Sequence, residues 1–149
     1  VSLASVHHNG TQWVVAGNSG TILTSPDAVS WTTQTIPVSG EFLFLQEVYY
    51  GDSQWVVVGD RSTILTSPDG VTWTSRMSPA PALFGVHYDG TQWVSAGDSE
   101  ILTSPDGVTW TLQADPAGTG FLSGVGGAGS TPSATPAFWT AFRNTKELR

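Results

Sequence analysis

Hydrophobic residues recur at every second position in short segments of this chain, and turn residues separate the segments. Leu83–Tyr88 alternates apolar with small or polar side chains, Asp89-Gly90 follows, and Gln92–Ala96 is the expected partner strand. A period of two predicts β-strands, and Asp-Gly between two such segments is a strong signal for a tight hairpin. We therefore expect two antiparallel strands joined by a short turn.

Two further segments continue this pattern. Glu100–Thr103 and Val108–Leu112 are rich in residues that favour strands, and the turn sequence Ser104-Pro105-Asp106-Gly107 separates them. The stretch that begins at Leu83 thus predicts four short antiparallel strands.

This stretch occurs three times in the chain. The equivalent blocks are Leu3-x-x-Val6, Leu45-x-x-Val48 and Leu83-x-x-Val86; Asn9–Gly17, Gly51–Gly59 and Asp89–Gly97; and Ile22–Trp31, Ile64–Trp73 and Ile101–Trp110. A period of about 40 residues with four antiparallel strands per unit is typical of a β-propeller blade. We predict an all-β fold of propeller blades, with a β-sandwich as the alternative.

A fourth unit begins near the C-terminus. Leu122–Val125 matches Leu83–Val86, and Phe138–Phe142 matches Gln92–Ala96. We therefore expect about three and a half blades in a single partial domain, at about 3–42, 43–80, 81–118 and 119–149. Because a propeller needs at least about four blades to close, we expect a longer chain or a second copy to complete it.

Composition excludes several classes of protein. The chain has 149 residues, a formal net charge of −7 and no cysteine. Without cysteine there is no disulfide framework or thiolate metal site. A chain with so few cations is a poor nucleic-acid binder, and no apolar run approaches the ~20 residues of a membrane span. We expect no cofactor, no metal, no nucleic-acid partner and no transmembrane segment.

The recurring turn has a local structural explanation. Its serine and aspartate can accept hydrogen bonds from backbone amides of the turn, its glycine tolerates positive φ, and its tryptophan packs over it. The first copy departs from the pattern, with Ala28 where the others have glycine. The residues that we assign this structural role are Ser25, Asp27, Trp31, Ser67, Asp69, Gly70, Trp73, Ser104, Asp106, Gly107 and Trp110.

At the level of these motifs the chain resembles the Asp-box, or BNR, repeats of a β-propeller superfamily that includes sialidases, sortilin-type receptors and photosystem II assembly factors. The order Leu-x-x-Val, Trp-Val-x-x-Gly, Ile-Leu-Thr-Ser and Ser-Pro-Asp-Gly-x-x-Trp is similar to the assembly-factor type and to repeats in phage tail and secreted proteins. The resemblance is strong over residues 3–112 and weak over 121–149. It implies a fold and not an activity.

An enzymatic site is not apparent in the sequence. A sialidase-like site needs converging arginines, and of the arginines only Arg61 lies in a repeat near strand ends. His7 and His87 are equivalent, but a metal site would need a third ligand that the pattern does not supply. The tryptophans that recur with the blades could stack on sugars, although equivalent tryptophans favour an inter-blade core. We expect no catalytic residue.

Binding is expected in the loops that depart from the repeat. These are Ile36–Gln46, Met77–Leu83 and Asp115–Phe121, and such loops on a rigid scaffold often carry recognition. The candidate partner-binding residues are Phe42, Phe44, Asp60, Met77 and Asp98.

The function that we expect is non-catalytic recognition or structural support at a virion tail or extracellular surface, with a host glycan or a partner protein as the ligand. An assembly factor that binds a protein complex is one alternative, and a glycosidase or sialidase-like enzyme is another.

Overall fold

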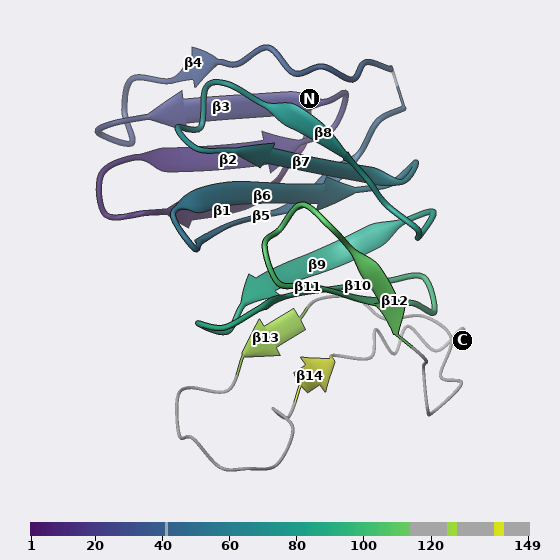
Figure 1. Cartoon of the computed structure of the whole chain (residues 1–149). Coiled ribbons are helices and arrows are strands. Elements are labelled where there is room, and N and C mark those ends of the chain that lie inside the picture. The colour runs from purple at the N-terminus through teal and green to yellow at the C-terminus, as the bar shows by residue number, and fades with distance from the viewer. Residues whose placement is uncertain (41, 114–124, 128–138, 142–149) are drawn as a thin grey trace, which may run out of the picture.

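The computed structural model describes residues 1–40, 42–113, 125–127 and 139–141. Three antiparallel sheets of four strands follow one another, each with its strands in chain order (Figure 1). They contain β1 (Leu3–His8), β2 (Trp13–Gly17), β3 (Thr21–Ser25) and β4 (Thr32–Thr33); β5 (Leu45–Gly51), β6 (Gln54–Gly59), β7 (Thr63–Ser67) and β8 (Thr74–Met77); and β9 (Leu83–Tyr88), β10 (Trp93–Gly97), β11 (Ile101–Ser104) and β12 (Thr111–Gln113). The described residues contain no helix, which confirms the all-β prediction.

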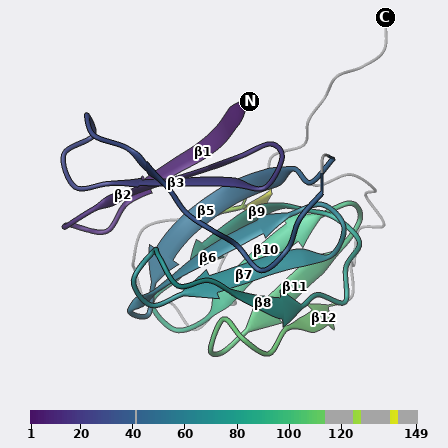
Figure 2. The same ribbon diagram turned by 90° about the horizontal axis from the view of Figure 1, so that it is seen from above.

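The sheets pack face to face like successive blades. The first strand of each sheet lies beside the first strand of the next, so β1, β5 and β9 form a continuous inner row (Figures 1 and 2). The remaining strands of each sheet extend away from this row. The inner row therefore marks the side toward the axis that the sheets share.

A two-stranded ribbon continues the row. β13 (Val125–Gly127) pairs with β14 (Trp139–Ala141) and lies beside β9. In the ribbon Trp139 is opposite Gly127, as Trp93 is opposite Tyr88 in the third sheet. Gly127 and Tyr88 each follow an equivalent valine by two residues, so the register of the fourth unit matches that of the third. The rest of the fourth unit lies outside the described residues.

The core lies between the sheets and forms two clusters. The first joins residues of β2 and β3 to residues of the second sheet, among them Val14, Ile22, Leu45, Val48 and Trp55. The second repeats this packing between the second and third sheets, with Val56, Ile64, Leu83, Val86 and Trp93. Full burial of one such side chain stabilises the fold by roughly 1.5–3 kcal/mol. The sheets are therefore held together chiefly by apolar contacts between equivalent positions.

The predicted start of the last strand is wrong by three residues. We expected it at Val108, but β12 begins at Thr111. The amides of Val108 and Thr109 each donate to Asp106 Oδ1 at 2.8 Å. Since the aspartate accepts these two hydrogen bonds, the amides belong to the turn and strand pairing begins after it.

The Ala28→Gly substitution should stabilise the fold. Ala28 has a φ of 62°, close to the 77° of Gly70 and the 71° of Gly107 at the equivalent positions. A side chain in this left-handed region costs about 1 kcal/mol relative to glycine. For a chain of this size we expect a rise in melting temperature of about 2–4 °C, measured by calorimetry.

The reverse substitution is the control for this experiment. Gly70→Ala should lower the melting temperature, because an added Cβ would meet the same left-handed strain and lie 2.9 Å from Gln12 Nε2. An unchanged or lower melting temperature for Ala28→Gly would contradict the proposed strain.

Candidate functional site

The recurring aspartates are held within their own turns. Asp69 Oδ1 accepts hydrogen bonds from the amides of Thr72 at 2.7 Å and Val71 at 2.8 Å, and from Ser67 Oγ at 3.0 Å. These bonds hold the pKa of Asp69 well below its usual range, at about 2. The hydrogen bonds of the turn therefore favour the charged carboxylate. Asp27 and Asp106 repeat the arrangement, and the pKa of each is lowered in the same way.

The tryptophans of the second and third turns close over them. Trp73 Nε1 donates to the carbonyl of Gly70 at 2.9 Å, and Trp110 Nε1 donates to that of Gly107 at 3.0 Å. Both indoles are buried, whereas Trp31 in the first turn is exposed. The serines of these turns, Ser25, Ser67 and Ser104, are buried as well.

Each buried turn also binds the preceding sheet. Gln12 Nε2 donates to the carbonyl of Asp69 at 2.6 Å, and Gln54 Nε2 donates to that of Asp106 at 2.6 Å. A glutamine precedes the repeated tryptophan in each of the first three units, and the bond is made at both contacts between their sheets. These turns therefore hold neighbouring sheets together.

Two of the repeated tryptophans of the second strands lie inside the protein, whereas Trp13 is partly exposed. Trp55 and Trp93 are fully buried between sheets, so their faces are not open to a sugar. The side chain of Trp139 lies outside the described residues. In the described chain no group of three or more His, Cys, Asp or Glu residues could hold a metal ion.

The candidate partner-binding residues all lie at one end of the sheets, which we call the loop end. Phe42 and Phe44 precede β5, Asp60 follows β6, Met77 ends β8 and Asp98 follows β10. Antiparallel order brings the start of odd-numbered strands and the finish of even-numbered strands to this same end. The Ser-Pro-Asp turns and the hairpins that follow β1, β5 and β9 lie at the opposite end.

Only part of this set is free to touch a partner. Phe42 and Met77 are 63% and 91% exposed, and Asp98 is exposed as well. Asp60 Oδ1 accepts a hydrogen bond from the amide of Phe44 at 2.9 Å, so both residues hold the loop to the β6–β7 turn. The polar residue Asp60 therefore has a structural partner within the sheet.

A cation that the sequence analysis did not select lies among these residues. Arg61, in the β6–β7 turn, is exposed and has a φ of 53°. The equivalent residues in the other units are Ser19 and Ser99. The departure from the repeat was the signal in the sequence, but only the strand order shows that Arg61 lies between Phe42 and Met77.

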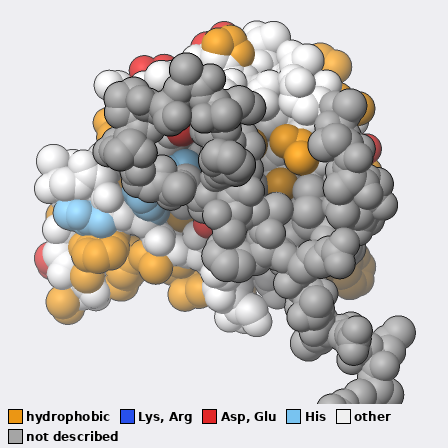
Figure 3. All heavy atoms as spheres, turned by 90° about the horizontal axis from the view of Figure 1, so that it is seen from below, with side chains coloured by type: hydrophobic (Ala, Val, Ile, Leu, Met, Phe, Trp, Pro, Cys, Tyr) orange, Lys and Arg blue, Asp and Glu red, His pale blue; other side chains and the backbone are white. Residues whose placement is uncertain are grey.

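An aromatic row crosses the inner strands. The ring of Tyr49 lies 4.4 Å from that of His7 and 4.6 Å from that of His87, centroid to centroid. Figure 3 shows histidine side chains beside hydrophobic side chains on the face seen from below. Each residue of the row directly follows the valine of the Leu-x-x-Val block in its unit. The repeat therefore predicted that the three positions are equivalent, but not that their rings are in contact. Burial lowers the pKa of both histidines, which favours neutral imidazoles within the row.

A partly buried carboxylate joins the second and third sheets beside this row. Glu47 Oε2 accepts a hydrogen bond from the amide of Val86 at 2.8 Å. Ser5 Oγ accepts one from the amide of Val48 at 3.2 Å at the equivalent place one sheet earlier. Burial raises the pKa of Glu47, and the hydrogen bond from Val86 opposes that rise only in part.

Glu47→Gln should increase stability at neutral pH. The folded-state pKa of Glu47 lies above its ordinary value of 4.5, so its stabilising contribution is complete below that pH and declines as pH rises through the folded pKa. Glutamine keeps an oxygen for the amide of Val86 and stays neutral. We expect a higher melting temperature than wild type at pH 7 and convergence of the two near pH 4. Equal melting temperatures of the two proteins throughout this pH range would contradict the inference that the buried charge of Glu47 destabilises the fold.

Asp69→Asn should decrease stability with the opposite pH dependence. The lowered pKa means that the carboxylate stabilises the fold above its ordinary pKa of 3.8 and loses this effect as pH falls toward about 2. We expect a lower melting temperature at pH 7 and a shrinking difference from wild type between pH 4 and pH 2. Asp98→Asn, at an exposed turn, is the matched control and should leave the melting temperature unchanged.

Comparison with known proteins identifies the fold. No known family model matches the sequence, and no curated protein matches it. Among solved structures the chain is similar to YCF48 bound to D1 peptide, with a TM-score of 0.70 and 15% identity over 81% of this chain and 43% of that one. It thus spans less than half the length of the YCF48 structure. In the part of the chain that the structure describes, no helix is long and apolar enough to cross a membrane.

Two other solved structures are similar. The computationally designed Ika4 protein has a TM-score of 0.64 and 14% identity over 84% of this chain and 79% of that one. The native Bacillus subtilis arabinanase Arb43A has a TM-score of 0.44 and 14% identity over 76% of this chain and 56% of that one. With three four-stranded sheets in blade order and the likeness to YCF48, the chain has the β-propeller fold.

Proposed function

We propose that this protein is a non-catalytic recognition module that binds a protein partner at the loop end of its second sheet. The observation that carries this proposal is the alignment of Phe42, Arg61 and Met77 along that end. Phe42 precedes the innermost strand, Arg61 lies in the turn between the two middle strands and Met77 ends the outermost strand.

The chemistry of this strip suits a polypeptide. Aromatic residues, methionine and arginine are enriched in protein interfaces. Phe42 and Met77 expose apolar surface that is not buried in the core, and Arg61 can pair with a carboxylate of the partner. A segment that carries an acidic residue between two apolar residues would match the strip.

The repeat supports this assignment. Arg61 replaces a serine found in the other two units, and Met77 stands where the first unit has Thr35. The residue before Met77 keeps the structural bond of its equivalent in the first unit: Arg76 Nε and Gln34 Nε2 both donate to a threonine hydroxyl of the neighbouring strand. YCF48, with the same fold, was solved with a bound peptide, which supports peptide recognition by such a scaffold.

Five of the described acidic residues have structural roles, which supports a non-catalytic module. Asp27, Asp69 and Asp106 serve their turns, Asp60 holds Phe44, and Glu47 joins two inner strands. A glycosidase needs two carboxylates that face one cleft. We further propose an extracellular or virion surface as the setting, on the strength of the hydroxyl-rich composition and the motif resemblance.

Peptide display tests the proposal. The immobilised chain should enrich peptides from a random display library, and Phe42→Ser with Met77→Ser should weaken their binding by at least about tenfold, as expected for loss of two interface anchors worth more than 1 kcal/mol together. Arg61→Ser should weaken the binding of those selected peptides that carry acidic residues. It should not make the binding of any peptide more sensitive to salt.

The matched control is at the opposite end of the sheets. Val29→Ser with Val71→Ser removes exposed apolar side chains there and should leave peptide binding unchanged. Absence of enriched peptides, equal binding by the loop-end and control variants, or binding on a glycan array that depends on Phe42 would overturn the protein-binding proposal.

A further inference from the structure

The second sheet ends on its outer side in a strand with one unpaired edge. β8 is the last strand in the order β5-β6-β7-β8, and no described strand pairs with its other side (Figure 2). It pairs with β7 over four residues without a register shift, whereas the outer strands β4 and β12 have two and three residues. Of the three outer edges, that of β8 is therefore the longest template for a further strand.

The backbone groups of Ser75 and Met77 form this edge. In an antiparallel pair, residues whose backbone groups bond the partner strand alternate with residues whose groups point away from it. In the first sheet the Gln34 amide donates to the carbonyl of Ile22 at 2.8 Å, and Arg76 holds the equivalent position in β8. Because Arg76 bonds β7, its neighbours Ser75 and Met77 direct their N–H and C=O groups away from the sheet.

Arg76 adds a charge beside this edge that the fold does not require. Its Nε donates to Thr66 Oγ1 at 2.8 Å. The equivalent residues Gln34 and Gln113 donate from Nε2 to threonine hydroxyls at 2.7 and 2.8 Å. A neutral glutamine is thus sufficient for the structural bond. Since Arg76 makes that bond through Nε, Nη1 and Nη2 can pair with a carboxylate.

The distribution of charge favours an acidic segment on this edge. The chain has a net charge of −7, yet both arginines of the part that the structure describes belong to the second sheet. Arg61 lies in the β6–β7 turn, and Arg76 precedes the last residue of β8. An extended segment with a carboxylate would therefore meet two cations along one path from the outer edge to the loop end.

We propose that the protein partner binds as an additional strand on β8, with an acidic residue opposite Arg76 and an apolar residue beside Met77. This inference rests on the proposed function and specifies how the partner is held. Residues directly opposite in neighbouring strands place their side chains on the same face, and consecutive residues point to opposite faces. The acidic and the apolar residue of the partner are therefore consecutive. Backbone hydrogen bonds provide affinity and these side chains provide specificity.

Met77 connects this edge to the loop end. It is the last residue of β8 and is 91% exposed. A segment that pairs with β8 passes beside Met77 where it leaves the edge, and it can continue over Arg61 to Phe42. The added strand and the strip at the loop end therefore form one binding surface.

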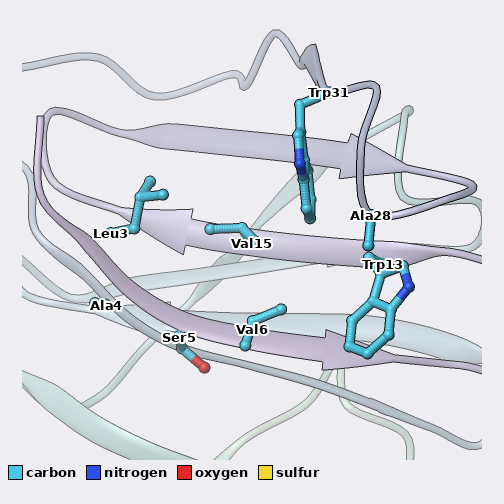
Figure 4. Close-up of a pocket in the computed structure, with 8 residues that line it drawn as sticks. All are labelled: Leu3, Ala4, Ser5, Val6, Trp13, Val15, Ala28 and Trp31. Atoms are coloured by element: carbon cyan, nitrogen blue, oxygen red, sulfur yellow. The ribbon is translucent and has the colours of Figure 1, made fainter.

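The first sheet lacks these features and supplies a control. Its outer strand β4 has two residues. Its exposed apolar side chains lie on the face of the sheet and not along the outer edge: Leu3 and Val6, each 56% exposed, line a hollow over β1 and β2 (Figure 4). Thr33 is opposite a leucine of β3, as Ser75 is opposite the equivalent leucine of β7, so the amide of Thr33 also points outward.

A proline substitution tests the edge. Ser75→Pro removes an amide that points away from the sheet, so β8 can still pair with β7, but the ring blocks an added strand. We expect the peptides selected by the wild-type chain from the display library to bind at least about tenfold more weakly. The circular dichroism spectrum should match that of the wild type. Thr33→Pro is the matched control and should leave peptide binding unchanged.

Arg76→Gln tests the charge without altering the backbone. Glutamine keeps the bond to Thr66, as it does in the other two sheets, so the melting temperature should not change. Binding of those selected peptides that carry an acidic residue should weaken and become less sensitive to salt. Unchanged binding of these peptides would overturn the position that we assign to the acidic residue.

Methylation of the peptide amides tests the pairing on the unaltered protein. In a strand paired along one edge, alternate amides face the neighbouring strand. N-methylation should therefore weaken binding at every second position by at least about tenfold and have little effect at the positions between.

The outcomes separate this inference from the proposed function. If binding depends on Phe42 and Met77 but shows no alternation with N-methylation, or is unchanged in Ser75→Pro, the strand on β8 is overturned and the proposed function stands. If no peptide is enriched, or if binding does not depend on Phe42 and Met77, both are overturned.

Discussion

The packing of each sheet against the next is the interaction on which this structure depends. A four-stranded sheet with apolar side chains on both faces is not stable alone, and here two such sheets bury Val, Leu, Ile and Trp side chains between them. The hydrogen bonds from Gln12 and Gln54 to the Ser-Pro-Asp turn of the next sheet fix the relative position of the sheets. The Ser-Pro-Asp turn therefore has two roles: its serine and aspartate side chains bind its own backbone, and its backbone carbonyl binds the preceding sheet.

Much of the fold follows from the sequence because it is local or repeated. The alternation in Leu83–Tyr88 and the Asp89-Gly90 turn predicted a hairpin. Because the same pattern recurs along the chain, the sequence predicted the other sheets and the ribbon as well. The wrong start of the last strand at Val108 has a local cause too. Valine favours strands, but here the Asp106 carboxylate binds the Val108 amide and keeps it in the turn. Propensity describes a side chain, whereas this boundary depends on a backbone hydrogen bond.

The candidate site was less accessible to prediction, because it depends on which strands become neighbours. Phe42 and Met77 depart from the repeat, but they are 35 positions apart in the sequence. They lie at the same end of the second sheet only because of the strand order β5 to β8. The His7–Tyr49–His87 row likewise requires the inner strands of three sheets to align. Glu47 gave no signal of its own, since its role beside Val86 arises from a hydrogen bond between units.

The exposure of Leu3 and Val6 in the first sheet has a consequence for local stability. In an array whose units contact only their neighbours, stability is approximately a sum of unit terms and interface terms. The second sheet has an interface on each side, whereas in the single chain the first sheet has one, on its β5 side. Local opening should therefore begin at β1 and β4, and amide exchange there should be faster than in β6 or β7.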